Sequence, residues 1–270
     1  MKEYTVKKIS VITVSFNAAA TIETAIKSVQ TQICPDIEHI IIDGGSIDQT
    51  AKIIERHRKG IAYYISEPDT GIYNAMNKGI RAATGDILFF LNADDRFSDP
   101  EVVKDVVSVF QKYPDLEIVY GELTWERPDK NLNSSQPSLI NREFLASRTI
   151  LHQTVFARAA VFEATQGFSE HYKVVSDYEW MLKVFLRDKR RYLYIDRKIA
   201  VMNTQGRSWT TKWENERIRV MMHYFSPYEI WKYRIRPRQK PIIRNYLNAK
   251  KVSFKKVINR ISNGIVNIKI

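Results

Sequence analysis

The sequence has little of several features that would place it in other protein classes. Only Cys34 is a cysteine among 270 residues, so no internal disulfide can form, which suits a reducing compartment. No apolar run reaches the roughly 18 residues of a membrane-spanning helix. Residues 1–8 lack the apolar region of a signal peptide, and the chain shows no internal repeat. These absences favour a globular protein of the cytoplasm.

Acidic residues are scarce in one part of the chain only. The net charge is +12, and residues 227–270 hold 12 Lys and Arg against one acid, Glu229. Residues 1–226 hold 30 basic and 29 acidic residues, and 44% of the whole chain is hydrophobic. We therefore predict a near-neutral globular domain over residues 1–226 and a separate basic tail over residues 227–270.

The tail mixes its charges with aromatic and aliphatic side chains, among them Trp231, Tyr246 and Phe254. Basic amphipathic segments of this kind lie on anionic membrane surfaces. We predict a helical tail that holds the protein on the inner face of the cell membrane. The alternative is a basic helix packed on the domain. Charge alone would also permit nucleic-acid binding, but no nucleic-acid module accompanies it, so that partner is not expected.

A short apolar stretch, Ile87 to Leu91, lies between Gly85-Asp86 and a polar cluster. Five apolar residues in a row indicate a strand that is buried on both faces, as in a parallel sheet. Asn92, Asp94 and Asp95 follow at its carboxyl end, where open α/β sheets bind ligands. Oxygen ligands of this type suit magnesium or manganese. The alternative is an acidic turn that caps the next helix.

The first 95 residues alternate between strand and helix patterns. We predict strands at 9–16, 40–42, 61–65 and 87–91. Between these strands we predict helices over residues 18–32, from just after Ser46, and over residues 72–83. The second helix is predicted to begin after Ser46 because Ser46 and Gln49 have capping-box spacing. This order predicts an α/β fold with a doubly wound, mostly parallel sheet and helices on both of its faces.

The remainder of the domain gives weaker signals. Asp99-Pro100 has the pattern of a helix start, with Asp99 as N-cap and Pro100 in the first position. We predict a mobile loop over 125–137 and a helix that opens at Ser176. Further strands are predicted at residues 116–120, 154–157, 192–195 and 199–202.

Several motifs occur in a fixed order, each near a predicted strand end or helix start. They are Asp43-Gly44-Gly45-Ser46-x-Asp48-x-Thr50, Asp69-x-Gly71-Ile72-Tyr73-Asn74-Ala75-Met76-Asn77-Lys78-Gly79, Gly85-Asp86 to Asn92-Ala93-Asp94-Asp95, His152-Gln153, Gly167-Phe168 and Ser176-Asp177-Tyr178-Glu179. Together they resemble family 2 glycosyltransferases over residues 8–208. The nearest resemblance is to bacterial enzymes that assemble exopolysaccharide or O-antigen repeat units.

The resemblance implies a GT-A fold, a nucleotide-sugar donor such as a UDP-sugar, a divalent Mn²⁺ or Mg²⁺ ion, and inversion at the anomeric carbon. It implies a glycan acceptor, which a lipid-linked chain at the membrane would supply. By motif position the donor-binding residues would be Val14, Ser15, Asn17, Asp43, Asp69, Gly71, Asn77, Lys78, Asn92, Ala93 and Asp94, with Asp94 also holding the metal. The general base would be Asp177, and the acceptor-side residues would be Asp95, His152, Gln153, Tyr178 and Glu179.

Several of these side chains have structural alternatives. Asp177 has the position of a helix N-cap, and Asp43 could orient the glycine turn that follows it. His152 could be structural, and Lys78 could be a solvated helix residue. As a base, Asp177 would work best with its pKa raised by partial burial.

Two other functions compete with the transferase. Sugar-nucleotide pyrophosphorylases have a similar sheet but would carry a glycine-rich basic loop after the first strand, where this chain has Ser15-Phe16-Asn17-Ala18-Ala19. A non-catalytic sugar-binding or scaffold subunit is suggested by Asn92, which replaces the first Asp of the family's Asp-x-Asp motif. Met76 also replaces an Arg that is frequent in the family.

Overall fold

The computed structural model describes residues 6, 8–34, 36–127, 131–203 and 213–235. Two compact units divide the chain. The first consists of residues 1–140 and 150–213, and the second of residues 141–149 and 214–270. The predicted membrane-binding tail falls mostly on residues 236–270, which lie outside the described residues.

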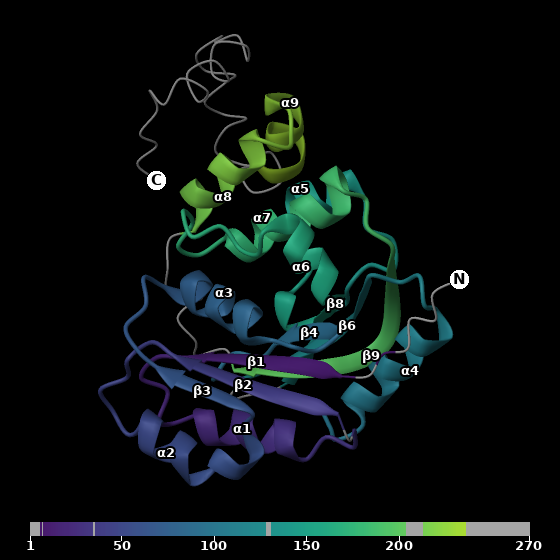
Figure 1. Cartoon of the computed structure of the whole chain (residues 1–270). Helices are drawn as coiled ribbons and strands as arrows, with labels where there is room; N and C mark the ends of the chain where they lie inside the picture. The colour runs from purple at the N-terminus through teal and green to yellow at the C-terminus, as the bar shows by residue number, and fades with distance from the viewer. Residues whose placement is uncertain (1–5, 7, 35, 128–130, 204–212, 236–270) are drawn as a thin grey trace. The chain divides into compact units, whose positions relative to one another are not determined.

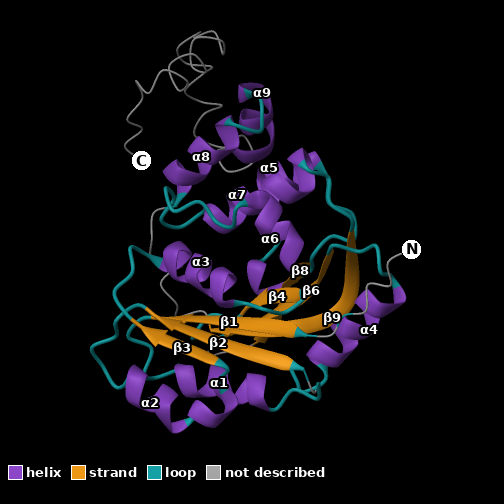
Figure 2. Ribbon diagram, viewed as in Figure 1, coloured by secondary structure: helices purple, strands orange, loops and turns teal. Residues whose placement is uncertain are grey.

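The first unit is an α/β domain built on one curled sheet, in the order β3-β2-β1-β4-β8-β6-β9-β5 with β7 paired to β6 (Figures 1 and 2). Among the described strands, β5, β7 and β8 run opposite to the others, so the sheet is mostly parallel. The bounds are β1 Ile9–Ser15, β2 Ile37–Asp43, β3 Tyr63–Ser66, β4 Ile87–Phe90, β5 Asp95–Phe97, β6 Ile118–Glu126, β7 Asn131–Asn133, β8 Val155–Arg158 and β9 Tyr192–Asn203.

Helices cover both faces of the sheet, as predicted. Figure 1 shows α1 and α2 on one face of β1 to β3 and α3 on the other. The bounds are α1 Ile22–Gln30, α2 Thr50–Arg56, α3 Ile72–Ala82, α4 Val102–Lys112, α6 Ala159–Thr165 and α7 Ser176–Leu182. Short 3₁₀ helices, η1 Arg58–Gly60 and η2 His152–Thr154, and a π-helix, η3 Lys183–Arg187, complete the unit. The predicted doubly wound architecture is confirmed.

The two faces of β4 pack into different parts of the core, which explains its unbroken apolar sequence. Phe89 stacks on Phe156 of β8 with ring centroids 4.1 Å apart. Phe90 contacts Phe168 on the other face, at 5.2 Å. On that face Gly79 lets α3 approach β1, because a Cβ at this position would overlap the side chain of Ile12.

An aromatic cluster anchors α7 on the same face as α3. Trp180 stacks on Phe162 of α6 with centroids 4.7 Å apart, and its indole Nε1 donates to Thr165 Oγ1 at 2.9 Å. Trp180 is 1% exposed, so its contacts hold α7 against α6. Asp177 lies in the first turn of α7 and is positioned with it.

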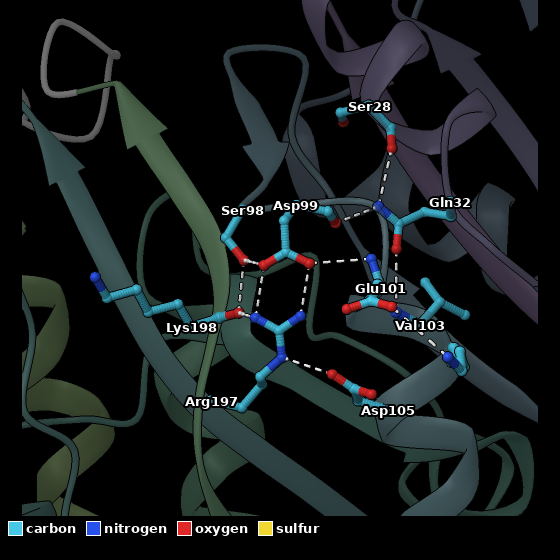
Figure 3. A network of polar contacts seen from close by, with 10 residues as sticks. Ser28, Gln32, Ser98, Asp99, Glu101, Val103, Asp105, Arg197 and Lys198 are labelled. Atoms are coloured by element: carbon cyan, nitrogen blue, oxygen red, sulfur yellow. Dashed lines mark hydrogen bonds and ion pairs between the residues drawn. The ribbon is translucent and has the colours of Figure 1, made fainter.

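A polar network ties β9 to the start of α4 (Figure 3). The Arg197 guanidinium donates two bonds of 2.6 Å to the Asp99 carboxylate and one of 2.8 Å to Asp105. The bonds from Arg197 lower the pKa of Asp99 to about 2. Asp99 Oδ1 also accepts from Glu101 N at 3.0 Å, but α4 begins at Val102, later than the predicted start at Pro100.

Other boundaries differ from the prediction for local reasons. The helix predicted after Ser46 begins at Thr50, because the Ser46 hydroxyl donates to Asp43 and forms no capping box. The helix predicted over 18–32 begins at Ile22.

The second half of the sheet also differs from the prediction. The two predicted closing strands are a single strand, β9. The predicted mobile loop 125–137 contains the end of β6 and the paired strand β7. Neither β5, α5 nor α6 had been predicted.

The second unit contains short helices, α5 Arg142–Ser147, α8 Glu214–Met222, α9 Pro227–Ile230 and the π-helix η5 Trp231–Ile235. Within it Arg142 Nε donates to Glu229 Oε1 at 2.6 Å, and this bond lowers the pKa of Glu229 to about 2. Ser226 and Glu229 form a capping box at α9. No helix in the described part of the chain has the length and apolar character needed to cross a bilayer.

Candidate active site

The carboxyl ends of four parallel strands, β1 to β4, bring most of the predicted donor-binding residues to one edge. The loops after β1 and β2 are joined there by Asn17, whose Oδ1 accepts from Ile47 N at 3.0 Å and whose own N donates to Ser46 Oγ at 2.7 Å. Asn17 has a φ of 50°, which asparagine tolerates better than most residues. Val14 and Ser15 lie buried just before it.

Asp43 ends β2 and is fully buried. Its Oδ1 accepts from Ser15 Oγ at 2.9 Å and from Ser46 Oγ at 2.6 Å. Its Oδ2 accepts from Ser46 N at 2.9 Å and from Ser66 Oγ at 2.7 Å. These bonds join three strand ends, so the carboxylate organises this edge of the sheet. Its predicted contact with a nucleotide stays a prediction.

Asp69 and two glycines shape the next part of the edge. Asp69 Oδ1 accepts from Gly71 N at 2.8 Å, and Gly71 has a φ of 137°, which favours glycine. A Cβ at Gly44 would overlap the other Asp69 carboxylate oxygen, so the glycine lets Asp69 close over this turn. Phe16 and Ile47 are 44% and 92% exposed at the same edge.

Asn77 and Lys78 contact neighbouring loops of the protein. Asn77 Nδ2 donates to Phe168 O at 2.8 Å and to Glu170 Oε1 at 2.9 Å, and its Oδ1 accepts from Phe168 N at 2.9 Å. Lys78 Nζ lies 2.7 Å from Glu67 Oε1 and donates to Pro68 O at 3.3 Å. These contacts hold the segments on either side of α3, and the donor roles predicted for both residues are not tested by them.

The turn after β4 holds two adjacent carboxylates. Asp95 N donates to Asn92 O at 3.0 Å, which closes the turn, and Ala93 is buried within it. Burial raises the pKa of Asp94, and a smaller effect of His152 lowers it. Asp95 is 2% exposed, and burial and then the Asp94 charge raise its pKa well above its usual range.

Asp177 lies at the start of α7 between a tyrosine and a histidine. Its Oδ1 accepts from Tyr73 Oη at 3.0 Å, and its Oδ2 lies 3.1 Å from His152 Nδ1. The other ring nitrogen, Nε2, lies 3.4 Å from Nδ2 of Asn92. The site therefore connects the tip of β4 to the start of α7 through one imidazole.

The pKa of Asp177 is shifted opposite to the prediction. Burial alone would raise it, but the bond and charge of His152, with bonds from Tyr178 N and Tyr73, lower the pKa below its ordinary value. The expectation of a raised pKa is wrong because this side chain accepts from several donors, which favour its ionised form.

The other predicted acceptor-side residues are used within the protein. The Gln153 amide contacts Met202 Sδ at 3.1 Å, and Tyr178 is 2% exposed. Glu179 pairs with Lys183 at 2.9 Å along the helix. Of the acceptor-side group, His152 is therefore the residue that bonds to both Asp177 and the end of β4.

The turn after β4 is the predicted metal site. No group of three or more His, Cys, Asp or Glu side chains suited to a metal occurs among the described residues. However, both Asp95 oxygens and Asn92 Oδ1 are buried without a partner of hydrogen-bonding geometry, although the Gln153 and Asn92 amides lie near enough to lower the pKa of Asp95. A buried carboxylate in this state fits a cation beside Asp94.

Comparison with known proteins decides the family. The model of Glycosyl transferase family 2 matches residues 10–163, more than half of the chain. The chain belongs to glycosyl transferase family 2. An uncharacterized glycosyltransferase of Mycobacterium tuberculosis is 37% identical to it over 182 residues, which are 66% of this chain and 69% of that protein.

Solved structures share the fold of this chain. S. aureus TarS 1–349 in complex with UDP-GlcNAc has a TM-score of 0.70 at 17% identity, over 93% of this chain and 77% of that chain. Against a longer TarS chain the coverage is 40% of that chain. Glucosyl-3-phosphoglycerate synthase from Mycobacterium tuberculosis, in complex with Mn²⁺, UDP and glucosyl-3-phosphoglycerate, has a TM-score of 0.59 at 18% identity, over 81% of this chain and 80% of that chain. At these identities the likeness shows the fold, and the predicted GT-A fold is confirmed.

Sequence reasoning missed some of the residues that build the site of this family 2 glycosyltransferase. Tyr73, which bonds to Asp177, is 6% exposed and occurs inside the Asp69 to Gly79 motif, so its position was available as a signal. Glu170 gave no signal, although it accepts from Asn74 and Asn77 across 96 and 93 residues of sequence. Such long-range pairs depend on the fold.

Proposed function

We propose that this protein is an inverting, metal-dependent hexosyltransferase that moves a sugar from a nucleotide-sugar donor to a hydroxyl of a glycan. The observation that carries the proposal is the placement of the β1 to β4 strand ends, with Asp94 and Asp95, next to the Asp177–His152 pair. One side of the site thus offers carboxylates for a donor and its metal, and the other offers a proton acceptor 3.1 Å from an imidazole.

The donor would lie along the edge formed by Asn17, Asp43 and Asp69. A UDP-sugar is the first choice, because TarS and the phosphoglycerate synthase were solved with UDP-GlcNAc and with UDP. The turn at Gly71 gives room for a ligand at this edge, because no atom lies within 4 Å of the place where its Cβ would be.

Asp94 would hold a divalent ion, Mn²⁺ or Mg²⁺, with the unpartnered Asp95 carboxylate beside it. Such an ion supplies charge stabilisation to a diphosphate leaving group. The complex of the phosphoglycerate synthase contains Mn²⁺, which is consistent with this choice.

The chain's own residues would handle the acceptor. Inversion is one displacement, so one basic group suffices to remove the proton of the acceptor hydroxyl. Asp177 would supply that base, and His152, whose Nδ1 lies 3.1 Å from its Oδ2, would line the acceptor side. The carboxylate is 21% exposed and the imidazole 14%, so both have access to an acceptor.

The acceptor would be a lipid-linked glycan in bacterial surface polysaccharide synthesis, reached from the inner face of the membrane. Residues 236–270 carry ten Lys and Arg and no acid, which suits an anionic bilayer. A chain ended after Ile235 keeps the Arg142–Glu229 pair. It should lose co-sedimentation with vesicles that contain phosphatidylglycerol, whereas equal binding by both proteins would refute the membrane role.

Turnover of a donor panel tests the enzyme assignment. The full chain is incubated with UDP-glucose, UDP-galactose, UDP-GlcNAc or GDP-mannose, with Mn²⁺ and methanol as a minimal acceptor. We expect release of nucleoside diphosphate that EDTA abolishes, and a methyl glycoside of inverted configuration by NMR. Donor binding without any release would support the alternative of a non-catalytic sugar-binding subunit, and a retained configuration would refute inversion.

A further inference from the structure

The first turn of α7 has a tyrosine from another helix at its N-terminal end. Val175 stands in the N-cap position, where its side chain cannot accept a hydrogen bond, so the first N–H groups of α7 have no cap from this residue. The hydroxyl of Tyr73, from the first turn of α3, lies at this point, 2.8 Å from Val174 O and 3.0 Å from Asp177 Oδ1. The start of α7 is therefore tied to α3 through one phenol.

Tyr73 is a fixed and neutral donor. The residue is 6% exposed, and its ring lies against Phe168 with centroids 5.8 Å apart. Burial raises the pKa of the phenol well above its usual range and the charge of Asp177 adds to this, whereas backbone N–H groups of Asp177 and Ser176 act in the opposite direction. The phenol therefore keeps its hydrogen, and a carbonyl and a carboxylate oxygen are there to accept it.

The orientation of a carboxylate depends on its partners, because its terminal torsion is broad and has no sharply preferred value. In Asp177 the two oxygens have different partners. Oδ1 accepts from Tyr73 Oη at 3.0 Å, and Oδ2 lies 3.1 Å from His152 Nδ1. The other nitrogen of His152 lies 3.4 Å from Asn92 Nδ2. Oδ2 is thus the oxygen that faces the imidazole at the tip of β4, and Oδ1 is held toward α3.

We propose that Tyr73 is a positioning residue of the transfer reaction: its hydroxyl holds Oδ1 of Asp177 toward α3, which leaves Oδ2 directed at the acceptor hydroxyl. This inference rests on the proposed transferase function and keeps Asp177 as the base. In the step itself the acceptor oxygen bonds to the anomeric carbon while the bond from that carbon to the diphosphate oxygen breaks, and the hydroxyl proton passes to Oδ2. The diphosphate leaves with the electron pair of the broken bond, and Tyr73 keeps its own proton.

Other contacts of α3 hold the segment before α7 without the phenol. Asn77 binds both the N–H and the carbonyl of Phe168, at 2.9 and 2.8 Å. Asn74 and Asn77 each donate to the Glu170 carboxylate at 2.9 Å. These bonds remain when the Tyr73 hydroxyl is absent. Tyr73→Phe should therefore free the catalytic carboxylate while the fold of this segment is kept.

Steady-state kinetics of the full chain test this role. The assay is UDP release from UDP-GlcNAc or UDP-glucose, with Mn²⁺ and with methanol as acceptor. In Tyr73→Phe we expect kcat to fall roughly 10–100-fold, because a base that is free to rotate is seldom aligned, with the KM for donor changed less than about twofold. A kcat within about threefold of wild type, or a loss that appears mainly in KM, would overturn the proposal.

A double variant separates a role through Asp177 from an independent one. If Tyr73 acts only by orienting this carboxylate, its hydroxyl has no further effect once the base is gone. Asp177→Asn combined with Tyr73→Phe should therefore be about as slow as Asp177→Asn alone. A second loss as large as that of Tyr73→Phe alone would show an independent structural effect and would overturn the proposal.

Tyr120 offers a matched control in the same unit. It is a fully buried tyrosine of β6, and its hydroxyl donates to Pro137 O at 2.5 Å, in the segment that follows β7. Tyr120→Phe should lower Tm as Tyr73→Phe does but should leave kcat unchanged. An equal loss of kcat in both variants would show that the effect is not particular to the phenol beside Asp177, which would count against the proposal.

Crystal structures of the ligand-free wild type and of Tyr73→Phe test the same inference without turnover. We expect one orientation of the Asp177 carboxylate in the wild type. In Tyr73→Phe it should be rotated or divided between orientations, while the contacts of Asn77 with Phe168 persist. A carboxylate that keeps its orientation in the variant would overturn the proposal whether or not a donor is turned over, so its failure is distinct from failure of the transferase function.

Discussion

The Asp43 network predicts how two substitutions at one position should differ. Asp43→Ala removes the acceptor for the buried Ser15 hydroxyl and for three partly buried donors, Ser46 N, Ser46 Oγ and Ser66 Oγ. Leaving a buried donor unpaired costs about 1–3 kcal/mol, and partly buried donors cost less because water can reach them, so the one buried and three partly buried donors together imply a loss of about 3 kcal/mol. For a domain of this size that is a fall in Tm of about 6–12 °C.

Asp43→Asn should cost far less. The amide oxygen can take the place of Oδ2 and accept from Ser46 N and Ser66 Oγ. The amide nitrogen then lies where Oδ1 was, and the hydroxyls of Ser15 and Ser46 can rotate to accept from it. We expect a loss of about 1 kcal/mol.

The pair of variants also separates the structural role of Asp43 from its predicted ligand role. Tm is measured by differential scanning calorimetry and UDP affinity by titration with Mn²⁺ present. If the carboxylate contacts the nucleotide, Asp43→Asn stays folded but binds UDP at least tenfold more weakly. Unchanged affinity would assign Asp43 to the network alone. A Tm fall under about 2 °C in Asp43→Ala would refute the energetic reasoning, and Ser66→Ala, which removes one partly buried bond, is the control.

Three further predictions follow from the core and from the network of Figure 3. Burial lowers the pKa of His39 to about 3, whereas in the unfolded chain it is about 6.5. As pH falls below about 6.5, the imidazole is therefore protonated in the unfolded chain but stays neutral in the folded protein, which favours unfolding. The unfolding free energy of wild type should therefore fall more steeply between pH 6 and 4 than that of His39→Gln, by about 1 kcal/mol per pH unit in urea titrations; equal slopes would contradict this. Gly79→Ala should lower stability by about 1–3 kcal/mol through overlap with Ile12, with UDP affinity kept; a neutral effect would show that α3 can shift. Arg197→Met should cost about 1–2 kcal/mol by chemical denaturation, and no loss would mean that Asp99 and Asp105 find other partners.

The sequence predicted the parallel half of the sheet well, for a physical reason. Strands such as Ile87 to Phe90 are buried on both faces, so every residue is apolar and the pattern is local. The short antiparallel strand β5 could not be predicted, because Asp95 and Arg96 are polar and the strand exists only by pairing with β9. The start of α2 was misplaced because the Ser46 side chain bonds to Asp43 and does not cap the helix.

The candidate site was predicted as a set of residues but not as a geometry. Strand ends such as Asp43 could be placed at one edge because parallel strands share it. The contact between His152 and Asp177 spans 25 residues and depends on how α7 packs through Trp180, which no local pattern contains. The direction of the Asp177 pKa shift was wrong for the same reason, since its donors come from other elements.

Hydrogen–deuterium exchange on addition of UDP and Mn²⁺ tests the central claim most directly. The claim is that the donor binds at the carboxyl edge of β1 to β4. The account predicts new protection in residues 16–19, 44–50, 67–72 and 92–96. It predicts none at the opposite edge, where Lys8, Glu38 and Thr84 bond to one another. Protection at that opposite edge, or no protection with donor at saturating concentration, would contradict the account.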